Sequence, residues 1–104
     1  MIANSKNKLI NFLVSVRRLP PLSELSGEEE RMLFELYALA QEKDPILVKD
    51  VYGLSGFGSR STGYRTLVAL REKGVVEFEA NDPDRRKRHV RFTETADTIF
   101  KAFQ

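Results

Sequence analysis

Residues 59–93 read SRSTGYRTLVALREKGVVEFEANDPDRRKRHVRFT, and the spacing of the apolar residues changes within this stretch at Gly74. Before the glycine, apolar residues recur at helical spacing behind a serine that can cap a helix. The glycine itself stands where a left-handed residue ends many helices. After it, apolar and polar residues alternate, as they do in strands with one buried face. The stretch therefore predicts a helix over 59–73 and a hairpin of two strands, 75–79 and 89–93.

The turn of this hairpin, residues 81–88, carries an unbroken run of positive charge from Arg85 to Arg88. Four like charges in a row repel one another. A solvated turn could tolerate them, but a negatively charged partner explains them better. His89 follows the run and is expected to be a strand residue rather than a ligand or a pH switch.

Upstream of this stretch, the spacing of apolar residues predicts two further helices. Residues 4–18 have an amphipathic pattern that stops before Pro20. The second helix is expected to begin at Ser26, because Glu29 stands at the spacing of a capping box. The expected core-facing stripe of this second helix consists of Met32, Leu33, Leu36, Leu39 and Ala40.

A short third helix is predicted from Asp44-Pro45 to about Tyr52, with aspartate as N-cap and proline at the first helical position. The glycine-rich segment GLSGFGS follows it. These glycines could cradle a phosphate, but the segment lacks the Gly-Lys-Ser/Thr ending of such loops, so a helix–helix turn is favoured. After the hairpin, Thr93 or Thr95 can cap a last helix. The residues that this last helix is expected to bury are Ala96, Ile99, Phe100 and Phe103.

The length of 104 residues is that of one domain with a single core. Its expected parts are an N-terminal helix over 1–18, a core over 22–93 and a short C-terminal helix over 94–104. The absence of cysteine excludes disulfides and thiolate metal sites, and a single histidine leaves little for a Ser-His-Asp site. The apolar run 9–16 is too short and too interrupted for a signal peptide or a membrane span, so a cytoplasmic protein is expected.

The net charge of +2 hides an uneven distribution of charged residues. Residues 19–58 contain three basic and eight acidic residues, whereas residues 59–91 contain nine basic and five acidic residues. Residues 1–18 contain four basic residues and no acidic residue. An asymmetry of this kind favours one face that binds a polyanion.

Two short helices joined by a tight turn and followed by a hairpin predict a winged helix-turn-helix, a mainly α fold with a small β-hairpin in the order α-α-α-α-β-β-α. In this arrangement the second helix of the pair enters the major groove of DNA, and the tip of the hairpin reaches the backbone or the minor groove. A solvated helix face and a solvated turn are the alternatives. The residues expected to contact DNA are Ser59, Arg60, Ser61, Tyr64, Arg65, Arg85, Arg86, Lys87 and Arg88.

Over roughly residues 22–100 the chain also resembles the MarR-like transcriptional regulators. The resemblance rests on four motifs in the order and near the spacing of that family: Leu25-Ser26-Gly27-Glu28-Glu29, Leu70-Arg71-Glu72-Lys73-Gly74-Val75-Val76, Asp84-Arg85-Arg86 and Phe92-Thr93-Glu94. It implies that Arg86 reaches the minor groove and that the carboxylate of Asp84 orients it.

The expected function is that of a sequence-specific regulator that binds double-stranded DNA, as a dimeric repressor on a palindromic operator. A protein-interaction module and a non-specific nucleic-acid-binding accessory protein are the alternatives. No catalytic residue, metal site or cofactor is predicted, and no small-molecule effector is assigned. Helices 4–18 and 96–104 either pair across a two-fold axis as a homodimer or close the core of a monomer.

Overall fold

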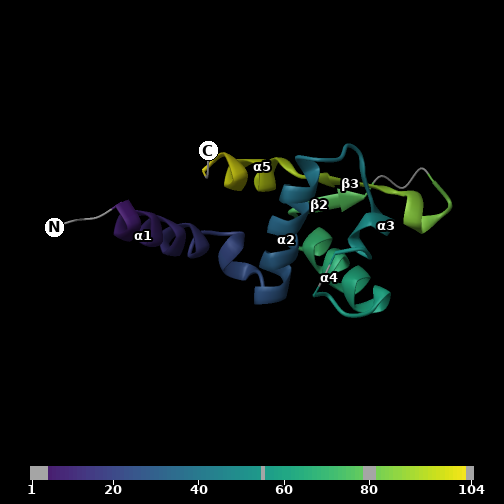
Figure 1. The fold of residues 1–104 in the computed structure, drawn as a ribbon, viewed down its shortest axis with the longest axis horizontal. Helices are drawn as coiled ribbons and strands as arrows, with labels where there is room; N and C mark the ends of the chain where they lie inside the picture. The colour runs from purple at the N-terminus through teal and green to yellow at the C-terminus, as the bar shows by residue number, and fades with distance from the viewer. Residues whose placement is uncertain (1–4, 55, 79–81, 103–104) are drawn as a thin grey trace.

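The computed structural model describes residues 5–54, 56–78 and 82–102, which form a mainly helical fold with one small antiparallel sheet (Figure 1). Two one-turn 3-10 helices, η1 and η2, stand among the helices and strands. The elements in chain order are α1 (Ser5–Arg17), η1 (Leu22–Glu24), α2 (Gly27–Ala40), β1 (Ile46–Leu47), α3 (Val48–Val51), α4 (Arg60–Glu72), β2 (Val76–Phe78), η2 (Arg85–Lys87), β3 (His89–Phe92) and α5 (Glu94–Lys101).

The predicted start of α2 is confirmed. The hydroxyl of Ser26 accepts a hydrogen bond from the Glu29 amide at 3.1 Å, and the carboxylate of Glu29 accepts one from the Ser26 amide at 2.9 Å. These bonds satisfy two donors that a helix start would otherwise leave unpaired. The predicted stripe is confirmed at its centre, where Met32, Leu33 and Leu36 are fully buried, whereas the last turn of α2 is only partly covered.

The predicted helix from Asp44-Pro45 to Tyr52 is wrong in its first part. Ile46 and Leu47 form a strand that pairs with Val90 and His89 of β3, and only residues 48–51 are helical. Pairing with a distant strand overrides the local N-cap signal, because it supplies backbone partners and buries Ile46. Asp50 then assists the later helix start, since its carboxylate accepts a hydrogen bond from the Leu47 amide at 2.8 Å.

The sheet has three strands in the order β1-β3-β2, so the predicted hairpin is present but is joined by a strand from far upstream. In the hairpin, Val76 lies opposite Phe92, and Phe78 lies opposite Val90. Strand β3 is therefore the central strand, bonded along both edges.

The turn between α3 and α4 is held against α2. Gly56 has a φ of 86°, which favours glycine, and its carbonyl accepts a hydrogen bond from the guanidinium of Arg31. The same guanidinium lies 4.4 Å from the ring centroid of Phe57, which is buried. These contacts explain the glycines as turn residues and fix the point at which α4 begins.

Helix α4 has the predicted ends. The hydroxyl of Ser59 accepts a hydrogen bond from the Thr62 amide at 3.3 Å, and Gly74 after the helix has a φ of 78°. Its inner face buries Gly63, Leu67 and Leu70, as expected from their spacing.

Helix α5 is capped by Thr93 rather than by Thr95. The Thr93 hydroxyl accepts a hydrogen bond from the Ala96 amide at 3.3 Å and donates one to the Gly74 carbonyl at 2.6 Å. Ala96, Ile99 and Phe100 are buried, as expected, while Phe103 lies outside the described residues. The ring of Phe100 packs on that of Tyr37 in α2, with the centroids 4.2 Å apart.

Helix α1 extends from the rest of the structure (Figure 1), and the whole molecule, α1 included, has principal dimensions of 57 × 27 × 26 Å. Val16, near its end, is buried, but the preceding apolar residues are exposed, including Leu9 at 58% and Ile10 at 53%. Among the described residues, no helix combines the length and the apolar character that crossing a bilayer requires.

Lys73, directly after α4, ties the end of that helix to the start of α2. Its ammonium donates to the Glu24 carbonyl at 2.8 Å and also binds the carboxylate of Glu29. Burial disfavours the ionised form of Glu29, but the hydrogen bonds from Lys73 and Ser26 outweigh it and hold the pKa of Glu29 below the ordinary 4.5.

We expect Glu29→Gln to lower the free energy of unfolding at neutral pH by up to about 1 kcal/mol, because it removes the charge that pairs with Lys73. A lowered pKa contributes stability above the ordinary 4.5 that is lost as the pH falls below it. Urea unfolding between pH 7 and pH 3 should therefore show a smaller acid-induced loss for the variant than for the wild type.

Glu28→Gln is the matched control for this prediction, because it changes an exposed glutamate in the same helical turn. It should keep the pH dependence of the wild type. Equal acid-induced losses in the wild type and in Glu29→Gln would contradict the role of the Lys73–Glu29 pair.

Candidate nucleic-acid interface

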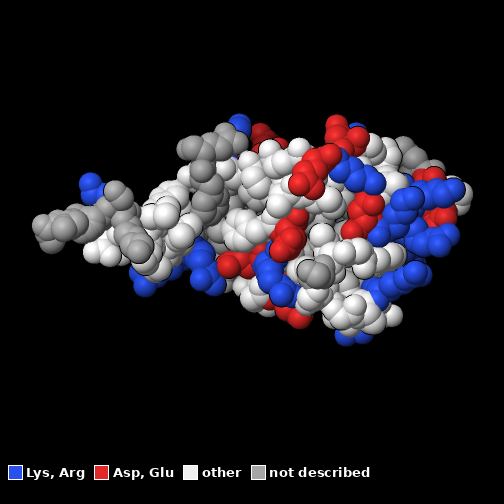
Figure 2. Space-filling model, viewed as in Figure 1, with Lys and Arg blue, Asp and Glu red and all other residues white. Residues whose placement is uncertain are grey.

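Lysine and arginine side chains gather at the end of the molecule opposite α1, over the hairpin turn and the start of α4 (Figures 1 and 2). We use "hairpin turn" for residues 82–88, the described part of the connection between β2 and β3. Acidic side chains lie mainly over the middle of the same view (Figure 2). The uneven charge along the sequence thus becomes a basic end of the folded molecule.

The predicted residues of α4 divide into two groups. Arg60, Ser61 and Arg65 are exposed along the helix, whereas Tyr64 is half-buried between other side chains. Ser59 is exposed too, but its hydroxyl is engaged as the N-cap. Arg60, Ser61 and Arg65 are therefore free to contact a partner with their side chains.

Tyr64 connects α4 to the hairpin turn. Its ring centroid lies 6.4 Å from that of Phe78 in β2, and the guanidinium carbon of Arg85 lies 4.8 Å from the Tyr64 centroid. Cation–π contact of this kind stabilises both groups. Tyr64 thus holds Arg85 against α4 instead of standing clear of the helix.

Asp84 and Arg86 form a closed contact within the hairpin turn. The carboxylate of Asp84 accepts hydrogen bonds from the Arg86 amide at 3.0 Å, from its Nε at 3.3 Å and from its Nη2 at 3.2 Å. The hydrogen bonds from Arg86 lower the pKa of Asp84 and raise that of Arg86. Asp84 also caps η2, so the same side chain shapes the backbone and orients the guanidinium.

Arg88 faces the interior of the hairpin turn more than its three predecessors do. Its Nε donates to the Asp82 carbonyl at 3.2 Å, and its own carbonyl accepts a hydrogen bond from the Val48 amide at 2.9 Å. Arg88 therefore stabilises the hairpin turn through these two hydrogen bonds. The three arginines of the run thus contact different partners, Arg85 an aromatic ring, Arg86 a carboxylate and Arg88 a backbone carbonyl.

A groove of about 500 Å³ opens between α3, the first residue of α4 and the hairpin turn. It is lined by Lys49, Tyr52, Gly53, Arg60, Asp84, Arg86 and Lys87. The guanidinium carbon of Arg60 lies 5.9 Å from the ring centroid of Tyr52 across this groove. The groove brings together cations that stand up to 38 positions apart in the sequence, counted from Lys49 to Lys87.

Lys49 and Tyr52 were not among the predicted interface residues. The sequence places both residues in the first helix of the predicted helix-turn-helix. In the structure this helix, α3, is one turn long, and its orientation is set by β1. The side of α3 that faces the hairpin turn could therefore not be read from spacing alone.

No group of three or more histidine, aspartate or glutamate side chains within residues 5–54, 56–78 and 82–102 is arranged to hold a metal ion. The groove combines one carboxylate with four cationic side chains, a set that suits an anion.

Comparison with protein-family models, with curated proteins and with solved structures finds no significant match. The likeness to MarR-like regulators therefore rests on the sequence motifs alone.

We expect Asp84→Asn to free the Arg86 side chain, because the charged acceptor of its Nε and Nη2 is lost. The order parameter of the Arg86 Nε–H group, measured by ¹⁵N relaxation, should fall toward values below about 0.6. In the wild type the hydrogen bonds from Arg86 hold the pKa of Asp84 below the ordinary 3.8, so the pair persists at pH 3.8, and acid that takes the pH through the lowered pKa should have the same effect.

Asp97→Asn on α5 serves as the control, because it removes an exposed carboxylate far from the hairpin turn. An Arg86 side chain that is equally mobile in the wild type and in Asp84→Asn would show that the pair does not position it.

Proposed function

We propose that the chain is a sequence-specific, double-stranded DNA-binding transcriptional regulator with a winged helix-turn-helix fold of the MarR-like kind. Helix α4 is the recognition helix in the major groove, and the hairpin turn is the wing at the adjacent minor groove. The observation that carries the proposal is that Arg60 of α4 and Arg86 and Lys87 of the hairpin turn line one groove.

The order and size of the elements support this assignment. Helix α3 and helix α4 are joined by residues 52–59, and the strands that follow α4 return with a charged tip, an order that fits a winged helix-turn-helix protein. In α4 the polar residues Arg60, Ser61 and Arg65 are exposed while Leu67 and Leu70 are buried, which leaves one polar side for the DNA. Arginine side chains on such a helix read guanine edges or bind phosphates.

The hairpin turn suits a narrow minor groove. Such a groove concentrates negative potential and attracts inserted arginine. The pairing with Asp84 fixes the direction of Arg86 before any DNA is bound, which reduces the entropy that binding must overcome. Sequence specificity in this proposal comes from α4, and the hairpin turn contributes affinity and register.

We expect Arg86→Ala to weaken binding to the preferred DNA site about tenfold, equivalent to about 1.4 kcal/mol. The guanidinium is exposed, so the fold should be retained, and the far-ultraviolet circular dichroism spectrum should be unchanged. The preferred site is first obtained by selection from a random pool of duplexes, and affinities are then measured by fluorescence anisotropy.

Lys101→Ala, on α5 at the other end of the molecule, is the charge-matched control and should bind like the wild type. Equal affinity for the selected site and for unrelated duplexes would replace this proposal with non-specific binding. No measurable affinity for any duplex would end the assignment to DNA altogether.

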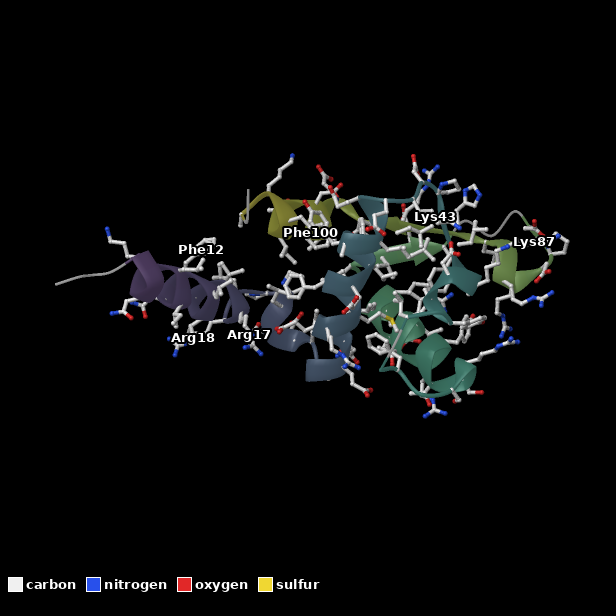
Figure 3. The ribbon with its side chains drawn as sticks, viewed as in Figure 1. Phe12, Arg17, Arg18, Lys43, Lys87 and Phe100 are labelled. Atoms are coloured by element: carbon white, nitrogen blue, oxygen red, sulfur yellow. The ribbon has the colours of Figure 1, made fainter. Side chains whose placement is uncertain are left out.

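We further propose that the regulator acts as a homodimer through α1, and that it represses by occupying a palindromic operator. Exposed Leu9, Ile10 and Val14 form an apolar surface on a helix that extends from the core. Beside it, Leu13, Phe34, Tyr37 and Phe100 line an apolar pocket of about 290 Å³ between α1, α2 and α5. Phe12 points from the side of α1 on which α5 lies, while Arg17 and Arg18 point from the other side of α1 (Figure 3).

Exposed apolar surfaces of this kind commonly mark association sites. A second copy that presents the same surface would cover both, as a two-fold interface requires. The α1 surface lies at the opposite end from the hairpin turn, so dimerisation leaves both basic ends open to DNA (Figure 1).

We expect Ile10→Asp to convert the protein to a monomer, because a charge would then lie within the apolar interface. Sedimentation velocity at tens of micromolar should show a dimer for the wild type and a monomer for the variant. Lys8→Asp changes a neighbouring exposed residue by a larger charge step and should leave the dimer largely intact. A wild type that sediments only as a monomer would contradict the dimer while leaving the DNA assignment open.

A further inference from the structure

The groove beside α3 is lined by four cationic side chains that come from three different elements. Lys49 comes from α3, Arg60 from α4, and Arg86 and Lys87 from η2. Lys49 forms no ion pair within the part of the chain that the structure describes, and it is exposed. Its ammonium is therefore available to an anion in the groove.

The acidic residue of the groove does not cancel these charges. The carboxylate of Asp84 is engaged by three hydrogen bonds from Arg86, so the two groups form an internally neutral pair. Lys49, Arg60 and Lys87 remain as cations around the opening. Three converging cations at one concave site favour an anion with several oxygen atoms.

The three elements are fixed relative to one another. The amide of Val48, the first residue of α3, donates to the carbonyl of Arg88 at 2.9 Å, which joins α3 to the end of the hairpin turn. On the other side, the ring of Tyr52 faces the guanidinium of Arg60 at 5.9 Å. Lys49 lies on α3 between these two connections, so its position relative to Lys87 and Arg60 is set by the fold and does not depend on the partner.

We propose that this groove binds a phosphodiester of the DNA backbone and that Lys49 is a contact residue of the interface. This inference rests on the proposed function. It adds α3 as a third contact element and places a phosphate between the recognition helix and the hairpin turn. A bound phosphate there fixes the register of α4 in the major groove, because it holds both elements at one point of the backbone.

A small soluble compound with a phosphate group offers the groove the same anionic oxygen atoms as the DNA backbone does. The DNA backbone is favoured because Arg60 and Lys87, which line the groove, are exposed and belong to the two elements assigned to the DNA grooves. Inorganic pyrophosphate serves as the probe for the small compound.

The test compares the salt dependence of duplex binding for the wild type, Lys49→Ala, Lys49→Arg and the control Lys101→Ala, by fluorescence anisotropy. We expect Lys49→Ala to weaken binding about three- to tenfold and to reduce the slope of log K against log salt by about 0.9, the value for one lost phosphate contact. Lys49→Arg should retain most of the affinity, and Lys101→Ala should match the wild type. Thermal unfolding of each variant checks that the fold is intact.

The outcomes separate this inference from the proposed function. A Lys49→Ala variant with the slope and affinity of the wild type, in a protein that binds DNA, would overturn the phosphate contact and leave the regulator assignment standing. Failure of the wild type to bind any duplex would overturn both. If pyrophosphate shifts the amide resonances of residues 48–53 and 84–87 while no duplex binds, the groove belongs to a soluble phosphate compound and the backbone assignment is wrong.

Discussion

Strand β3 forms backbone hydrogen bonds along both of its edges, and the placement of α3 relative to the hairpin turn depends on this. One edge pairs with β1, which leads directly into α3, and the other pairs with β2, which follows α4. Residue 88, just before β3, also accepts the first amide of α3. A strand of four residues thereby fixes two helices and a turn relative to one another, although they are far apart in the sequence.

The basic run at residues 85–88 shows how the fold disperses repulsion that the sequence concentrates. Arg85 lies over an aromatic ring of α4, Arg86 binds the carboxylate of Asp84, and Arg88 donates to a backbone carbonyl. Each contact compensates one charge or turns it away from its neighbours, and Lys87 is left at the groove. The turn can therefore be rigid and highly charged together, which a solvated loop with four mobile cations would not be.

The sequence predicted the features that depend on neighbouring residues and missed those that depend on distant ones. The caps at Ser26 and Ser59 and the glycine after α4 were read correctly, because each is a local hydrogen-bond or backbone requirement. Strand β1 was missed because its two residues form a strand by pairing with β3, which is distant in the sequence. The same strand orients α3, so Lys49 and Tyr52 could not be assigned to the groove, and the contact between Arg85 and Tyr64 lies beyond any sequence pattern.

The proposed dimer and the proposed DNA site constrain one another through the length of the molecule. The apolar surface of α1 and the basic groove lie toward opposite ends of a long axis of 57 Å. Two copies joined end to end along one line would carry their basic ends far beyond the separation of about 34 Å between successive major grooves on one side of a duplex. Binding of both α4 helices to one operator therefore requires the long axes to incline toward each other at the α1 interface. Crossing of the two α1 helices, with the pocket at Phe100 receiving part of the partner surface, is the arrangement that satisfies both requirements.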